Sequence, residues 1–280
     1  MRRNFAQVLK AGKIDLKNEY TKFYDLFYSK DSKDNKSMED IVSNNFTDYY
    51  FRGTCLTLEE FNETYGFKFE KQPQNFNEDY LVCFMEYTYN LIFYLNNTFY
   101  LDHIDMFYLD DNDKSFYLNQ IQRVIDVIGY VRAEEDGFII FVPKDNNAIA
   151  VAESKLIPDN ISYKVLEYNH HTMKGNIESK KETLIKFADI LEPKRVKLNE
   201  INKSFTSDLF QLINSCNIRH NNRDKDSNNY RKYIAEINNN ELEHIYDEIY
   251  QMCLLAFMQL EHTDRKDWIE ETKNNIVSIK

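Results

Sequence analysis

The residues best suited to chemistry in this sequence are an arginine and a histidine that stand side by side, Arg219 and His220. They lie near the start of a polar loop, residues 217–229, which follows a run of regularly spaced apolar residues. A guanidinium can hold a phosphate through two hydrogen bonds, and histidine can give or take a proton near neutral pH. Such a pair suits RNA cleavage without a metal ion, so we predict that Arg219 and His220 are catalytic.

Other side chains near this pair could bind RNA. Asn221, Asn222 and Arg223 follow it directly, and His171 lies in an upstream His-His pair that folding could bring close to the loop. We therefore predict RNA-binding roles for these four residues. The alternative is a solvated loop whose asparagines cap the flanking helices and whose arginine pairs with a carboxylate. The sequence leaves both interpretations open.

The charge of the chain is strongly acidic but unevenly spread. Its 280 residues include 35 basic and 46 acidic residues, giving a formal net charge of −11. This balance argues against broad binding of a nucleic acid backbone. Residues 1–160 and 234–280 are acidic, whereas residues 161–233 carry a net positive charge. If the chain meets a polyanion, we expect the contact in the 161–233 segment.

Several classes of protein are excluded by residue spacing. The six glycines are too far apart for a P-loop, a dinucleotide fingerprint or a hydrolase elbow,. The four cysteines form no C-x-x-C pair, so we expect reduced core thiols and neither a metal nor a cofactor,. The longest apolar run, residues 252–258, is far shorter than the roughly 18 residues of a membrane span,. We expect a cytoplasmic protein that makes no membrane contact.

These residues must be positioned by a predominantly helical α+β fold, since the chain is 42% hydrophobic with only six Gly and four Pro,. Apolar residues at helical spacing predict helices over 77–97, 114–128, 177–191 and 196–216, and a last one from near Asn240,. Three β-branched or aromatic runs predict a small antiparallel meander, with strands at 130–132, 138–142 and 148–152,. We expect three regions: an N-terminal helical region (1–75), helices with the meander (76–160) and a C-terminal helical bundle (161–280).

The order of elements in the C-terminal part matches a known pattern. A helical pair, an Ile-Arg-polar step at a helix end, a polar loop and a closing helix occupy about residues 165–262, centred on Ile218-Arg219-His220-Asn221. This resembles the HEPN superfamily, which is common in bacterial abortive-infection and toxin proteins. In that family an arginine, a polar residue and a histidine four to six residues after the arginine cleave RNA, with two subunits facing each other. Here residues 223–226 read Arg-Asp-Lys-Asp, so His220 would have to supply the histidine.

The resemblance implies a bacterial antiphage defence or toxin-type protein. It would be a homodimer through the bundle, act as a metal-independent endoribonuclease on RNA, and could have a protein partner or antitoxin. One alternative is a non-catalytic helical protein-interaction module that contacts a partner through its acidic N-terminal half. A second alternative comes from Glu153-Ser154-Lys155 after the third predicted strand, with Asp136 and Asp145 upstream. This pattern resembles the core of magnesium-dependent PD-(D/E)xK nucleases.

Overall fold

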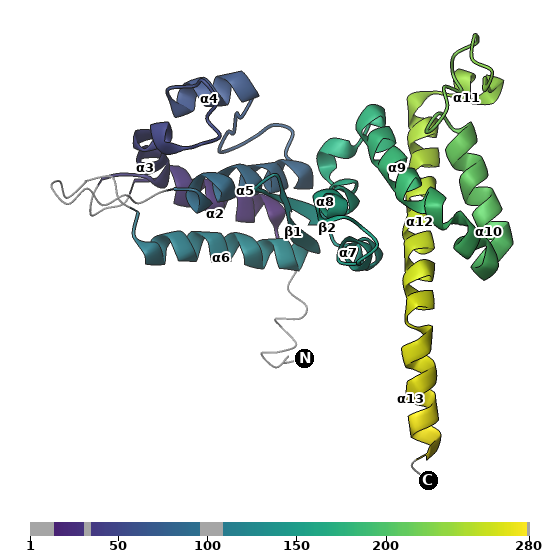
Figure 1. The fold of residues 1–280 in the computed structure, drawn as a ribbon. Coiled ribbons are helices and arrows are strands. Elements are labelled where there is room, and N and C mark those ends of the chain that lie inside the picture. The colour runs from purple at the N-terminus through teal and green to yellow at the C-terminus, as the bar shows by residue number, and fades with distance from the viewer. Residues whose placement is uncertain (1–13, 31–34, 96–108, 279–280) are drawn as a thin grey trace, which may run out of the picture. The chain divides into compact units, whose positions relative to one another are not determined.

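The computed structural model (Figure 1) describes most of the chain, namely residues 14–30, 35–95 and 109–278. The chain divides into two compact units, unit 1 ending at Phe141 and unit 2 beginning at Val142. The fold is predominantly helical with a two-stranded antiparallel sheet, which confirms the predicted α+β class. The expected region 1–75 and the first part of region 76–160 lie together in unit 1, and the remainder lies in unit 2.

Unit 1 combines helices with a β-hairpin. Its elements in chain order are α2 (Leu16–Tyr28), α3 (Met38–Asn44), the 3₁₀ turn η1 (Phe46–Asp48), α4 (Leu58–Tyr65), α5 (Glu78–Phe93), α6 (Asp111–Ile128), β1 (Tyr130–Glu135) and β2 (Phe138–Pro143). The helices predicted over 77–97 and 114–128 are confirmed as α5 and α6. Each begins at a side-chain cap, because Asn77 accepts the backbone N–H of Tyr80 and Asp110 that of Asn112,.

Helix α5 lies at the centre of the unit 1 core. Its Leu81, Phe84 and Leu91 side chains are buried, and the helix packs against α2 and α6. The Phe84 ring meets Tyr20 and Phe69 edge to face, with ring centroids 5.1 and 5.0 Å apart. Aromatic pairs favour this geometry, so contacts between rings stabilise the unit 1 core in addition to the burial of apolar area.

The hairpin is closed by the turn Asp136-Gly137. Both residues have positive φ, 49° and 88°, which suits the tight turn between antiparallel strands,. A polar side chain of α5 holds β2 in place, because the Asn90 amide exchanges two hydrogen bonds with the backbone of Ile139, at 2.8 and 2.9 Å. This contact gives hydrogen-bond partners to the backbone N–H and carbonyl of Ile139 on β2,.

The third predicted strand is wrong, because residues 148–152 belong to helix α7 (Asn146–Ala152). The Asp145 side chain caps this helix by accepting the backbone N–H groups of Asn147 and Ala148,. Alanine is the strongest helix former, and three of the seven residues of α7 are alanines,. The predicted meander is therefore a two-stranded hairpin followed by a helix.

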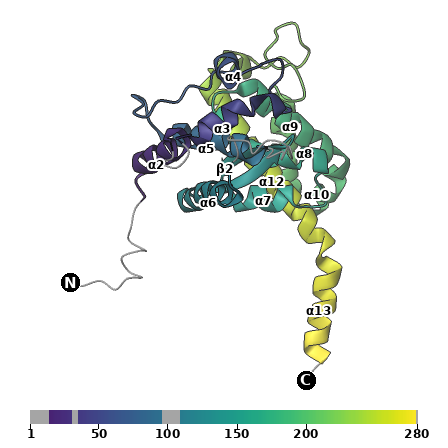
Figure 2. The same ribbon diagram turned by 90° about the vertical axis from the view of Figure 1, so that its left-hand side faces the viewer.

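Unit 2 is helical apart from the end of β2. Its further elements are α7, α8 (Asp159–Glu167), the 3₁₀ turn η2 (His171–Met173), α9 (Ile177–Leu191), the 3₁₀ turn η3 (Glu192–Lys194), α10 (Arg195–Ser215), α11 (Lys232–Glu236), α12 (Asn239–Asp264) and α13 (Lys266–Ser278). The three helices predicted here are confirmed as α9, α10 and α12. Helix α12 packs against α7, α9 and α10, and Figure 2 shows this group from a second side.

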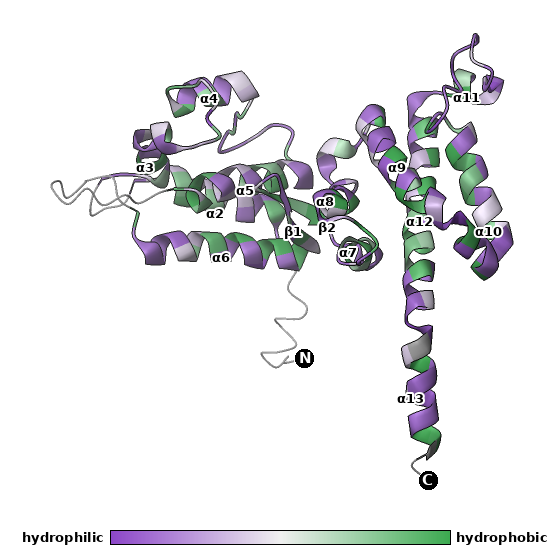
Figure 3. Cartoon of the chain, viewed as in Figure 1, coloured by the Kyte–Doolittle hydropathy of each residue, from purple (hydrophilic) through white to green (hydrophobic). Residues whose placement is uncertain are grey.

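Helix α13 follows α12 and extends beyond the other helices of unit 2 in both views (Figures 1 and 2). Figure 3 shows that it mixes hydrophilic and hydrophobic residues. Its Trp268, Ile276 and Val277 side chains are exposed. Among the helices in the described part of the chain, none has the length and apolar character that crossing a bilayer requires.

Candidate functional site

The loop that follows α10 is held in one conformation by a pair of asparagines. Asn217 has a positive φ of 61°, and its backbone N–H donates to Asn222 Oδ1 over 2.7 Å. In return the Asn222 N–H donates to Asn217 Oδ1 over 3.3 Å, and Asn222 Nδ2 donates to the Asn229 carbonyl over 2.7 Å. Asn222 is only 1% exposed. The predicted RNA ligand Asn222 thus lies inside the loop and organises it.

Further contacts fasten this loop to the bundle. Ile218 is buried in the unit 2 core, and the Tyr246 hydroxyl of α12 lies 3.4 Å from the carbonyl of Asn217. At the other end of the loop, the Arg231 N–H donates to the carbonyl of Asn222 over 2.8 Å. The backbone that carries Arg219 is therefore fixed by contacts on both sides.

The Arg219 guanidinium is already bound by carboxylates. Its Nη1 lies 2.6 Å from Glu192 Oε2 in η3, and its Nη2 lies 3.3 Å from Asp189 Oδ1 at the end of α9. The side chain is 30% exposed. Two of the five N–H donors of this guanidinium therefore already have carboxylate acceptors,. His220 is exposed, so the structure places the two predicted catalytic residues on one loop, with Arg219 turned to the α9–η3 corner.

The remaining predicted loop residues make local contacts. Asn221 lies exposed, and its Nδ2 donates to Asp224 Oδ2 over 3.3 Å. Arg223 is half-buried, and its Nη2 donates to the carbonyl of Ile237 over 3.2 Å. These contacts connect the loop to itself and to the segment between α11 and α12.

The upstream histidine pair belongs to the turn before α9. His171 is half-buried and begins η2, and the buried His170 caps this turn, its Nδ1 lying 2.7 Å from Thr172 Oγ1. The contacts of the 217–229 loop described above are made with η3, with the end of α9, with the segment after α11 and with α12. None of these contacts involves His171, which was predicted to lie close to the loop.

Sequence reasoning missed a polar cavity in unit 2, between the turn before α9 and the face of α12. The cavity has a volume of about 280 Å³ and is lined mainly by polar side chains, among them Tyr168, His170, Lys180 and Asp247. Lys180 is almost fully buried, and its Nζ lies 2.7 Å from both Glu243 Oε1 and Asp247 Oδ1. A buried ammonium requires such partners, because desolvation otherwise costs several kcal/mol, on the order of the whole stability of a domain.

Two tyrosines form the aromatic wall of this cavity. The rings of Tyr168 and Tyr250 stack with centroids 4.0 Å apart and planes 3° from parallel, and Lys180 Nζ lies 5.2 Å from the Tyr168 centroid. Burial raises the pKa of Tyr168 far above its ordinary value, and the negative charge of Asp247 raises it further. The Tyr168 hydroxyl therefore stays protonated at neutral pH.

A sequence signal for this cluster exists. Lys180 interrupts the apolar stripe of α9 that contains Ile177, Leu184 and Leu191, all of them buried. A lysine at such a position must be paired with an acid from another element. The i, i+4 carboxylates Glu243 and Asp247 of α12 are suitably spaced for this, because they lie on one face of the helix,.

Two of the carboxylates of the magnesium-nuclease alternative flank helix α7. Asp145 caps the start of α7 and Glu153 lies at its other end. Asp136 lies in the hairpin turn of unit 1. The strand on which this alternative depended is thus absent at 148–152, because a helix occupies those residues.

Comparison with protein-family models, with curated proteins and with solved structures gives no significant match to this chain. The fold, the 217–229 loop and the cluster around Lys180 are therefore interpreted from their own geometry.

Proposed function

We propose that this protein is a non-catalytic helical module that binds a protein partner. The observation that carries the proposal is the engagement of Arg219 by Glu192 and Asp189, at 2.6 and 3.3 Å. A phosphate that approached this guanidinium would meet the negative charges of both carboxylates and would have to compete with them for its N–H donors,. Asn222 and Arg223, the predicted RNA-binding residues, donate to the backbone carbonyls of Asn229 and Ile237.

We assign the partner contact to the acidic N-terminal half. Residues 1–160 carry a net negative charge, and several acidic side chains lie in the first turns of α3, α4, α5 and α6, where the helix dipole favours them,. An acidic surface of this kind favours a partner with a basic face, whose association slows as salt rises. Cross-linking of the full chain to its partner should give products within residues 14–141. Products confined to residues 217–231 would contradict this assignment.

To test whether the protein lacks ribonuclease activity, the purified full chain is incubated with total RNA, with and without EDTA. We expect intact RNA in both conditions. The R219A/H220A variant should behave as the wild type, and so should K225A, which changes an exposed cation in the same loop.

A second candidate function is a metal-independent ribonuclease of the HEPN kind. The observation that favours it is the exposed His220 beside Arg219 on a loop whose backbone is fixed by Asn217 and Asn222. RNA cleavage that persists in EDTA, is lost in R219A/H220A and survives in K225A would establish this function and overturn the first proposal. The expected homodimer belongs to this candidate, and light scattering of the purified chain measures it directly.

A further inference from the structure

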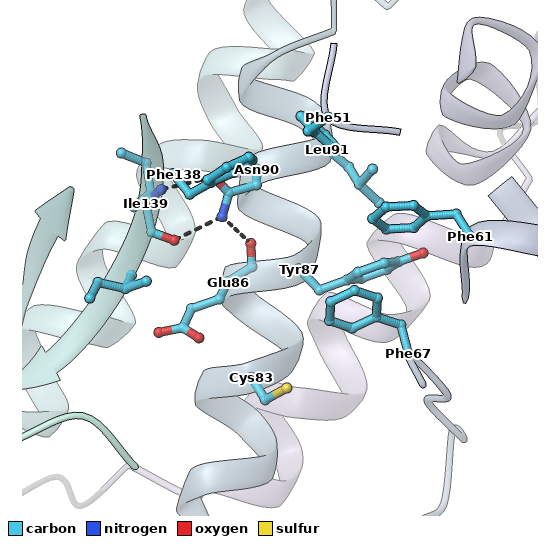
Figure 4. Close-up of a pocket in the computed structure, with 11 residues that line it drawn as sticks. Phe51, Phe61, Phe67, Cys83, Glu86, Tyr87, Asn90, Leu91, Phe138 and Ile139 are labelled. Atoms are coloured by element: carbon cyan, nitrogen blue, oxygen red, sulfur yellow. Dashed lines mark hydrogen bonds between the residues drawn. The ribbon is translucent and has the colours of Figure 1, made fainter. Parts of the chain in front are cut away.

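We propose that an aromatic pocket in unit 1 binds a small, uncharged aromatic molecule of one or two rings. This inference rests on unit 1 alone and is independent of the proposed function. The pocket has a volume of about 240 Å³, and five rings line it, those of Phe51, Phe61, Phe67, Tyr87 and Phe138. Figure 4 shows Phe61, Phe67 and Tyr87 grouped together beside α5, Phe138 next to Asn90 toward the strand, and Cys83 at one end.

The rings offer both faces and edges to a guest. Phe61 and Phe67 are stacked, with centroids 5.7 Å apart and planes 16° from parallel, while Phe67 and Tyr87 are tilted, with centroids 5.0 Å apart. Offset and edge-to-face contacts with a further ring stabilise a bound ring beyond the burial of apolar area. Ligand pockets are typically lined in this way by apolar side chains with few polar groups.

The polar side chains at the wall of the pocket bond the hairpin. The Asn90 amide is occupied by the backbone of Ile139, and Glu86 Oε1 accepts the Phe141 N–H over 2.6 Å. In Figure 4 the Glu86 carboxylate points away from the rings of Tyr87 and Phe67. A guest among the rings therefore meets no carboxylate directed at it, and its surroundings are mainly apolar, which favours an uncharged ligand,.

The thiol of Cys83 is uncharged as well. Burial and then the negative charge of Glu86 raise the pKa of Cys83 to about 11, so the group is a neutral thiol at pH 7. Cys83 is partly exposed, whereas Cys55, Cys216 and Cys253 are buried. A thiol reagent should therefore reach Cys83 first in the folded protein, and its labelling rate reports on the occupancy of the pocket.

The experiment uses the full chain with indole as probe, and with tryptamine and indole-3-carboxylate as charged analogues of the same ring. Labelling with a disulfide reagent at pH 9 should modify one thiol in the wild type, slowly because only a small fraction of Cys83 is thiolate, and none in C83S over the same time,. We expect saturating indole to slow this labelling at least fivefold and to give a saturable signal in calorimetry. The charged analogues should bind at least tenfold more weakly.

A variant whose side chain fills the pocket provides a second test of ligand binding. C83W should abolish the calorimetric signal of indole, while L255W, which adds the same ring at an exposed position of α12, should keep it. If C83W does not fold, as judged by circular dichroism, the protection of Cys83 in the wild type still decides the matter. Indole that neither slows labelling nor binds, or a charged analogue that binds as tightly, would overturn the proposal.

Discussion

Lys180 Nζ lies 2.7 Å from Asp247 Oδ1, although the Lys180 side chain is only 6% exposed. The same ammonium lies 2.7 Å from Glu243 Oε1, so one buried cation connects α9 to two successive turns of α12. Charges are removed from water at a high cost, and partners at short distance offset most of it. The cluster is therefore a strong determinant of how these two helices align.

Replacing Lys180 by methionine should destabilise the protein by about 2–4 kcal/mol, because Glu243 would lose its buried partner. The loss lies below that of a fully buried pair, since Asp247 is 46% exposed,. Urea unfolding followed by circular dichroism measures the change. K203M, at an exposed position of α10, is the matched control and should change stability by less than about 0.5 kcal/mol,. Adding E243Q and D247N to K180M should restore part of the loss; no recovery would contradict the ionic explanation.

Acid should weaken the same cluster. Burial alone would raise the pKa of Glu243, but the hydrogen bonds from Lys180 and from the Gly175 N–H outweigh it and lower the pKa below its ordinary 4.5. A lowered folded-state pKa means that the stabilisation is present above the ordinary value and is lost as pH falls through the folded value. The free energy of unfolding should therefore fall less steeply below pH 4.5 in E243Q than in the wild type. E241Q, an exposed change on the same helix, should follow the wild-type curve.

Elements of the fold that depend on neighbouring residues in the sequence are easier to predict than contacts between distant residues. Helices α5, α6, α9, α10 and α12 were predicted because long stretches of apolar residues repeat at helical spacing,. Residues 148–152 are a five-residue run of Ala, Ile and Val, which fits a strand as well as a buried helix,. The cap that the Asp145 side chain provides decides in favour of the helix,.

The sites were harder to predict than the fold. The sequence allowed Arg219 to pair with a carboxylate, but the partners Glu192 and Asp189 lie 27 and 30 residues away, across the whole of α10. Lys180 and Asp247 are 67 residues apart, so only the packing of α9 on α12 brings them together. The rings of the unit 1 pocket come from several segments, and a list of aromatic residues does not show which of them leave space between them.

The loop after α10 should lose its fixed conformation when Asn222 is replaced by alanine. The buried Asn217 N–H would lose its acceptor and the carbonyl of the exposed Asn229 would lose its donor, at a cost of about 1–3 kcal/mol that comes mainly from Asn217,. Trypsin can cut after the basic residues of this loop, so limited proteolysis of the folded protein measures how readily the loop opens. N222A should be cut several times faster than the wild type. N228A, an exposed asparagine of the same loop, is the control, and equal rates in both variants would contradict the assigned role of Asn222.

Releasing Arg219 from its carboxylates should strengthen phosphate binding at this guanidinium. In D189N/E192Q the oxygens beside the guanidinium belong to neutral amides, so the positive charge of Arg219 is no longer compensated. The affinity of the protein for single-stranded RNA should therefore rise several-fold. The slope of log affinity against log salt should steepen by about 0.7, the value of one added phosphate contact. Fluorescence anisotropy with a labelled oligonucleotide measures both. The control E200Q/D208N makes the same change of net charge at exposed positions of α10. An equal rise in both variants would mean that only overall charge acts; a gain abolished by adding R219Q would assign it to Arg219.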